Sequence, residues 1–206
     1  MNTNEQLIRH LIASGVLYSP SLIYAFKVCD RIHFIPEELY PRAYDDHPLP
    51  IGESQTISQP TTVAFMLELL NPTAGNKVLD IGSGSGWTTA LLAAAIGRDG
   101  YVEGVERVAS LIEYAHENLE KVHIHNGSIS LANPSVLGKP GEHYDRILVS
   151  ASATEMPTEL FDQLKSGGIL VVPVQNTIWR ITKKENGSLE SSEFPGFVFV
   201  PLITSV

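Results

Sequence analysis

The stretch VLDIGSGSGW, residues 78–87, decides how the rest of the chain is interpreted. Its apolar start is typical of a buried strand, and its alternate glycines are typical of a tight turn. The apolar residues that follow it are typical of a helix. Glycine tolerates positive φ and lets the backbone approach a ligand, and amides at a helix start attract anions. Gly82, Gly84 and Gly86 follow G-x-G-x-G, whereas dinucleotide-binding proteins have G-x-G-x-x-G and P-loops need Gly-Lys-Ser/Thr.

Acidic residues lie at the ends of the first two strands of this pattern. Asp80 is near the end of the strand expected at 77–81, and Glu106 ends the next strand, at 101–106. A carboxylate at the second position accepts hydrogen bonds from both hydroxyls of a ribose, and Asp80 can orient an ammonium group through water. With Ser83 in the turn, these residues favour S-adenosylmethionine, whose carboxylate suits the glycine loop. The alternative is a glycine-rich turn that binds nothing.

From residue 77 onward, strands alternate with helices, which predicts an α/β fold. Such units are right-handed and form a mostly parallel sheet, with helices on both faces and ligands beyond the carboxyl ends of the strands. An Asn186-Gly187 turn and the run 196–203 predict antiparallel strands at the C-terminal edge. The remaining expected strands are 122–126, 169–174 and one in 144–152 that leads into a loop. The expected helices are 5–15, 20–30, 60–70, 87–97, 107–120 and 158–167.

Composition narrows the class of protein. The 206 residues are 43% hydrophobic and 18% charged, which is typical of one globular domain. The net charge of -9 and the lack of a basic cluster argue against nucleic acid as a partner. The single cysteine, Cys29, fits a core position, and His123 and His125 lack the further ligands that a metal site needs. With no signal peptide and no apolar run of membrane length, we expect a soluble, cytoplasmic protein without a membrane partner.

The segment LPIGESQTISQP, residues 49–60, is a proline-stiffened loop rich in hydroxyl groups that leads into a helix. Together with the glycine loop, it resembles the protein-L-isoaspartate O-methyltransferase family, and LPIG followed by QTIS is specific to that family. The resemblance covers nearly the whole chain. It extends over DRIHFIPEELYPRAYDDHPLPIG, VLDIGSGSGWTTALLA, YDRILVSASATEMPTELFDQLKSGGILVVPV and VFVPLI.

The resemblance implies a class I methyltransferase (Rossmann-like) fold and S-adenosylmethionine as cofactor. It implies methyl transfer to the free carboxylate of L-isoaspartyl residues in damaged proteins or peptides, which is a repair reaction. We therefore expect a single, monomeric methyltransferase domain over 1–206. Residues 1–60 would form a helical cap and substrate loop, and residues 61–206 a cofactor-binding core.

The resemblance also places the family's active-site serine at Ser58. A carboxylate attacking a sulfonium methyl is already ionised, so it needs alignment and a dry site rather than a general base. Uncharged donors hold it without cancelling its nucleophilicity, which favours Thr56 and Ser58 for this role. The alternative is that Ser58 only caps the helix after it.

Three departures from the family pattern bear on cofactor and substrate. Ser54 and Gln175 stand where the family has glycine. The family's aspartate at the adenine is missing, which leaves Gly127 and either Ser128 or Asn126 for that contact. Two alternatives stay open: a carboxyl methyltransferase for aspartyl side chains of one peptide, and a cofactor-binding module without catalysis.

Overall fold

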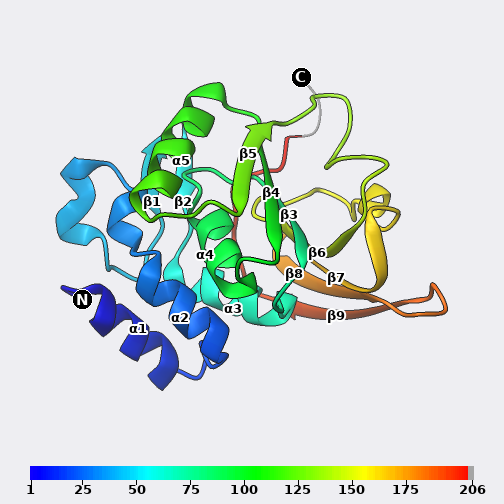
Figure 1. Ribbon diagram of the computed structural model, residues 1–206, viewed down its shortest axis with the longest axis horizontal. Helices are drawn as coiled ribbons and strands as arrows, with labels where there is room; N and C mark the ends of the chain where they lie inside the picture. The colour runs from blue at the N-terminus through cyan, green and yellow to red at the C-terminus, as the bar shows by residue number, and fades with distance from the viewer. Residues whose placement is uncertain (204–206) are drawn as a thin grey trace.

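The computed structural model describes residues 1–203 and contains one large sheet (Figure 1). Within these residues the strand order is β5-β4-β3-β6-β7-β8-β9. The first five strands in this order are parallel, and β8 and β9 add an antiparallel hairpin at the edge. The strands are β3 (Lys77–Ile81), β4 (Tyr101–Glu106), β5 (Gly127–Leu131), β6 (Tyr144–Val149), β7 (Leu164–Val174), β8 (Thr177–Lys183) and β9 (Leu189–Pro195).

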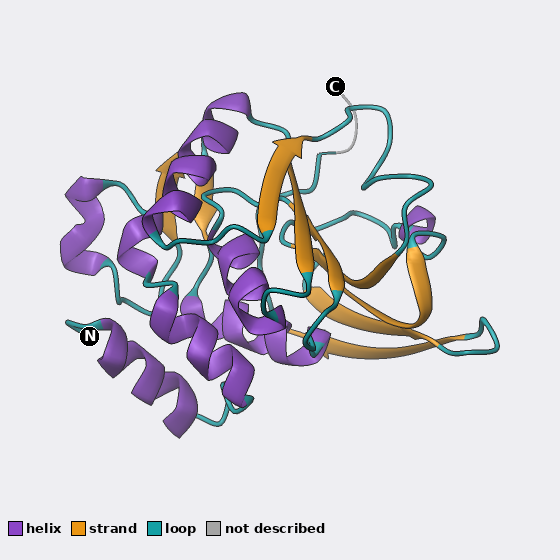
Figure 2. Ribbon diagram, viewed as in Figure 1, coloured by secondary structure: helices purple, strands orange, loops and turns teal. Residues whose placement is uncertain are grey.

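Five α-helices lie on one side of this sheet (Figure 2). They are α1 (Asn4–Ala13), α2 (Pro20–Val28), α3 (Pro60–Leu70), α4 (Trp87–Ile96) and α5 (Ala109–Lys121). The predicted boundaries at Ser19, which is the N-cap of α2, and at Gly97, which ends α4, are confirmed. One hydrophobic cluster on this face includes residues of all five helices, from α1 to α5.

The prediction of helices on both faces is wrong for the described residues. The second face is covered by loops and by the 3-10 helix η3 (Thr158–Leu160), where a longer helix over 158–167 was expected. Gln163 explains the difference, because its buried side chain donates to the carbonyl of Leu137 and accepts from the amide of Lys139. These tertiary bonds hold the segment as a turn.

The expected strand at 122–126 is also wrong. Helix α5 continues to Lys121, and β5 begins only at Gly127. His123 has a φ of 55°, in the left-handed region, so it ends the helix in a turn and does not share a strand face with His125. Among the described residues, no group of three or more His, Cys, Asp or Glu is placed to hold a metal ion.

The C-terminal residues 196–203 do not form the last strand, which is β9. At Gly196 the chain turns with a φ of 101°, and the following segment crosses the carboxyl edge of the parallel strands. There the amide of Ser152 donates to the carbonyl of Val200 at 2.8 Å, and the amide of Leu202 donates to the carbonyl of Ser152 at 2.7 Å. In Figure 1 this red segment runs towards the edge at which the β5 arrow points.

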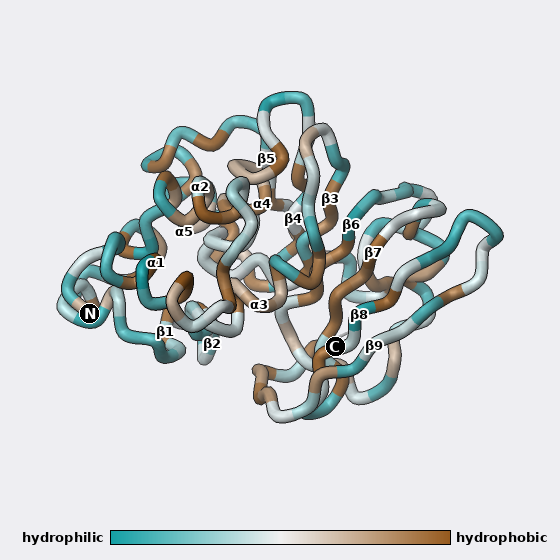
Figure 3. The backbone as a smooth tube through the Cα atoms, turned by 90° about the horizontal axis from the view of Figure 1, so that it is seen from below, coloured by the Kyte–Doolittle hydropathy of each residue, from teal (hydrophilic) through white to brown (hydrophobic). Residues whose placement is uncertain are grey.

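Hydropathy follows this arrangement. Figure 3 shows hydrophobic colour along the central strands and hydrophilic colour at the outer turns. None of the helices described within residues 1–203 is long and apolar enough to cross a membrane.

Candidate functional site

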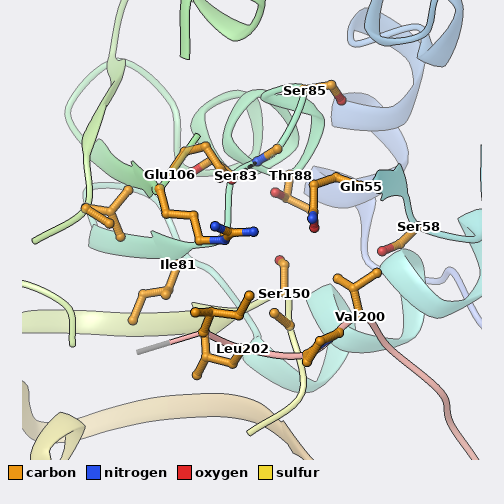
Figure 4. A pocket seen from close by; sticks show the side chains of 18 of the residues that line it. Gln55, Ser58, Ile81, Ser83, Ser85, Thr88, Glu106, Ser150, Val200 and Leu202 are labelled. Atoms are coloured by element: carbon orange, nitrogen blue, oxygen red, sulfur yellow. Dashed lines mark hydrogen bonds between the residues drawn. The ribbon is translucent and has the colours of Figure 1, made fainter. Parts of the chain in front are cut away.

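A cavity lies at the carboxyl edge of the parallel strands, where the strand order reverses around β3. It encloses about 970 Å³ of space between atoms, part of it open to solvent. Figure 4 shows Glu106 and Ser83 at one end, Ser58 at the other, and Thr88 and Ser150 between them. The carboxylate of Glu106 and the hydroxyl of Ser58 therefore lie at opposite ends of the cavity.

The glycine loop forms one wall. Gly82, Gly84 and Gly86 have φ values of 81°, 53° and 86°, in the left-handed region that favours glycine. Gly82, Ser83 and Gly84 line the cavity. Gly86 is not among the lining residues, and a Cβ built there would lie only 3.1 Å from the Cβ of Ala115 in α5. Gly86 therefore allows close packing of the loop on α5.

Glu106 joins the loop to the next strand. It is 6% exposed and lines the cavity. Its Oε2 accepts from the amide of Gly84 at 2.9 Å, and its Oε1 accepts from the amide of Val108 at 3.0 Å. Each carboxylate oxygen has a second lone pair, so Glu106 can hold the loop and still accept bonds from ligand hydroxyls.

Asp80 lies behind the loop. It is fully buried, and its Oδ2 accepts from the hydroxyls of Thr88 and Thr89, both at 2.7 Å. Burial raises the pKa of Asp80 to about 6, against the opposing effect of these hydroxyls. Its Oδ1 has no partner within the described chain. Asp80 is not among the cavity-lining residues, so its direct contribution is to fix the start of α4, and the contact through water stays a prediction.

Ser58 follows a small hairpin, β1 (Leu49–Gly52) and β2 (Gln55–Ile57), that forms the opposite wall. Its hydroxyl points into the cavity (Figure 4), and within residues 1–203 it makes no hydrogen bond. Gln59 is the N-cap of α3, and Asp46 accepts from the amide of Thr61 at 2.9 Å and from its hydroxyl at 2.7 Å. The cap interpretation of Ser58 is therefore wrong.

Comparison with sequence profiles of known families shows to which family the chain belongs. The profile of the Protein-L-isoaspartate(D-aspartate) O-methyltransferase (PCMT) family matches residues 2–206.

The chain belongs to the PCMT family.

Individual relatives agree with this assignment. The protein-L-isoaspartate O-methyltransferase of Methanopyrus kandleri is 42% identical over 204 residues, which cover 97% of this chain and 90% of the relative. That of Pyrococcus horikoshii is 38% identical, with 97% and 92% covered. A structure of the PCMT of Plasmodium falciparum in complex with S-adenosyl-L-homocysteine superposes with a TM-score of 0.87 at 28% identity, over 100% of both chains. The expected family, fold class and S-adenosylmethionine cofactor are confirmed.

A buried arginine holds the segment 43–58 of this PCMT member in place. Arg31 is fully buried, and its guanidinium donates to the carbonyl oxygens of four loop residues. They are Ala43 at 2.8 Å, Asp45 at 3.1 Å, His47 at 2.9 Å and Ser58 at 3.2 Å. The same guanidinium lies 5.5 Å from the centre of the Trp87 ring, at the start of α4. Arg31 therefore ties the segment carrying Ser58 to the helix that follows the glycine loop.

The two departures from the PCMT glycines occupy left-handed backbone. Ser54 has a φ of 57° in the β1–β2 turn, and Gln175 has a φ of 53° after β7. Gln175 also lies beside Ser152, whose hydroxyl donates to its carbonyl at 2.8 Å. Glycine adopts this conformation without the steric cost that Ser and Gln bear.

The expected adenine contacts need correction. Gly127 and Ser128 pair with the first residues of β4, at the amino end of β5, and neither is among the cavity-lining residues. The side-chain amide of Asn126 is bound to backbone carbonyls at the same end. The residues that follow β5 and line the cavity are Ala132 and Asn133. Asn133 thus lies in the position beyond a strand end at which Gly127 and Ser128 were expected, because the strand begins five residues later than the sequence suggested.

Sequence reasoning missed other lining residues. Ser150, directly after β6, is shared by the cavity and by a shallower groove beside Ser58 that includes Pro48 and Val198. The rule that ligands lie at carboxyl strand ends points to Ser150. The segment that contains Val200 and Leu202 gave no such signal, because its apolar pattern is that of a strand.

Proposed function

We propose that this chain transfers the methyl group of S-adenosylmethionine to the free carboxylate of L-isoaspartyl residues in damaged proteins or peptides. Membership of the PCMT family over residues 2–206 supports the reaction. One structural observation supports its geometry. Thr56, Ser58 and Ser150 belong both to the cavity and to the adjoining groove, so a carboxylate presented from the groove meets the cavity at three hydroxyls.

The residues around the cavity suit this cofactor. Backbone amides of Gly82, Ser83 and Gly84 would bind its carboxylate, and Glu106 would accept from its ribose hydroxyls. Asn133 would meet the adenine as a neutral partner in place of the family's acid. When bound, the cofactor supplies an electrophilic methyl group on a sulfonium.

The chain's own part in the reaction is alignment. Thr56 and Ser58 would donate to the substrate carboxylate and hold one oxygen in line with the methyl carbon. Because both side chains are uncharged, they would hold the nucleophile without the loss of reactivity that a tight ion pair with a cation causes. The methyl ester so formed closes to a succinimide, which reopens partly as normal aspartate.

The test uses an isoaspartyl peptide and its aspartyl twin with labelled cofactor. We expect methylation of the isoaspartyl peptide alone. Ser58→Ala should keep cofactor affinity by calorimetry but lower kcat about 100-fold, the scale for a misaligned nucleophile. Ser54→Ala is the matched control, because Ser54 lies in the same hairpin but is not among the lining residues.

Two results would contradict the proposal. Equal methylation of both peptides would favour an aspartyl carboxyl methyltransferase. Cofactor binding without turnover by the parent chain would favour a binding module. A monomeric state and a cytoplasmic location, which the sequence favours, stay predictions.

A further inference from the structure

The hairpin between β8 and β9 presents an Asn-Gly pair at the surface. Asn186 and Gly187 lie in a run of exposed residues, 184–193, that projects from the sheet edge (Figures 1 and 3). Gly187 has a φ of 82°. The side-chain oxygen of Asn186 accepts from the amide of Ser188 at 3.0 Å and from its hydroxyl at 2.7 Å.

This arrangement favours a known reaction of asparagine. The backbone nitrogen of Gly187 forms a bond to Cγ of Asn186, ammonia leaves, and a succinimide ring results. Water then opens the ring at one carbonyl to give aspartate, or at the other to give isoaspartate. Glycine has no Cβ to hinder the attack. The two bonds from Ser188 polarise the side-chain carbonyl and so favour addition to its carbon.

We propose that Asn186 is a deamidation site of this protein, and that the isoaspartyl form is methylated by a second copy of the chain. The second half of this inference rests on the proposed function, and the first half does not.

The other Asn-Gly pair in the sequence provides an internal contrast. The side-chain amide of Asn126 donates to the carbonyls of Ala93, Gly97 and Gly100 at 3.0, 2.8 and 3.3 Å. Gly127 is the first residue of β5. Each bond is worth about a factor of five, so the three bonds should slow ring closure at Asn126 about a hundredfold relative to an asparagine without such bonds. At the exposed turn, one bond from the amide of Gly187 to the carbonyl of Lys184 opposes the reaction.

The position of the hairpin requires a second copy. Strand β8 runs antiparallel to β7, with Thr177 opposite Val174 and Thr182 opposite Ile169. The turn after β8 therefore lies at the amino edge of the parallel strands, and the cavity lies at their carboxyl edge. The seven residues of β8 span roughly 20 Å, so the turn of one chain does not reach its own cavity.

The first experiment measures deamidation alone. The full chain is kept at neutral pH without cofactor for increasing times, digested, and mapped by mass spectrometry with fragmentation that separates aspartyl from isoaspartyl products. With three opposing bonds at Asn126 and one at the exposed turn, we expect isoaspartate to accumulate at Asn186 about 25-fold faster than at Asn126. Similar rates at the two sites, or an unchanged Asn186, would refute the proposal that Asn186 is a deamidation site.

The second experiment measures repair. Aged parent chain and aged Asn186→Gln chain are each mixed with fresh enzyme and labelled S-adenosylmethionine, beside an isoaspartyl peptide. We expect label on the peptide that contains residue 186 of the parent, at a rate proportional to the fresh enzyme added, and its loss in the variant. Equal labelling of parent and variant would overturn the proposal. An unlabelled isoaspartyl peptide would instead refute the proposed function, while the deamidation result stands.

Discussion

Gly104 and Gly127 are glycines of adjacent strands with different surroundings, and this difference predicts different effects of alanine. A Cβ built on Gly104 would lie 2.6 Å from the hydroxyl oxygen of Ser83 and 2.7 Å from Cγ1 of Ile129. Both distances are shorter than real contacts, so Ser83 must move. Overpacking of this kind costs about 1–3 kcal/mol of the free energy of unfolding. At Gly127 the nearest atom is Cγ2 of Thr89 at 3.4 Å, an ordinary contact.

A Cβ at Gly104 should also weaken cofactor binding, because the displaced Ser83 lines the cavity. Gly104→Ala should weaken S-adenosylmethionine about tenfold, the equivalent of one lost hydrogen bond. Gly127→Ala should change the free energy of unfolding by less than about 0.5 kcal/mol and leave affinity unaltered. Urea denaturation and calorimetry measure the two quantities. Equal destabilisation by both variants would refute the packing argument, and weaker binding by Gly127→Ala would refute the corrected position of β5.

Three further predictions concern backbone, loop and pH. Ser54→Gly and Gln175→Gly should each raise the free energy of unfolding by about 1 kcal/mol in urea denaturation, because both positions are left-handed. Lysine offers three donors to the four carbonyls that Arg31 binds, so Arg31→Lys should lower the free energy of unfolding by about 1–3 kcal/mol and should also lower kcat. An unchanged kcat would show that Arg31 does not position Ser58. Burial raises the pKa of Asp80 from 3.8 to about 6, so this carboxyl stabilises the fold below pH 3.8 and loses that contribution, about 3 kcal/mol, as pH rises to about 6. Relative to the parent, Asp80→Asn should therefore gain stability over that interval in urea denaturation, and parallel pH curves would contradict the shift.

Local signals predicted much of the cofactor core. The strand at 77–81, the glycine turn, the helix ending at Gly97 and the strand ending at Glu106 all have the expected bounds. Each is specified by its own residues: a short apolar run, glycines that take positive φ, and a glycine that ends a helix. A site built from consecutive strand ends can therefore be predicted from the sequence.

Where distant contacts decide, the sequence was not sufficient. The helix expected at 158–167 is replaced by a turn that Gln163 secures from another loop. The run 196–203 has a strand-like pattern, yet in the described structure it makes an isolated bridge, Pro201 with Ser152, instead of a continuous ladder. Arg31 stabilises four carbonyls that are far from it in sequence, and no local pattern points to such a residue.

The placement of the C-terminal segment couples ligand affinity to folding. The cavity is closed on one side by residues 55–58 and on another by 200–203, which lie far apart in the sequence. A molecule held between them acts as a noncovalent cross-link that only the completed fold offers. At a concentration one hundred times its Kd, such a ligand adds about 2.7 kcal/mol to the free energy of unfolding. Depletion of the methyl donor would thus leave the enzyme itself more prone to unfold.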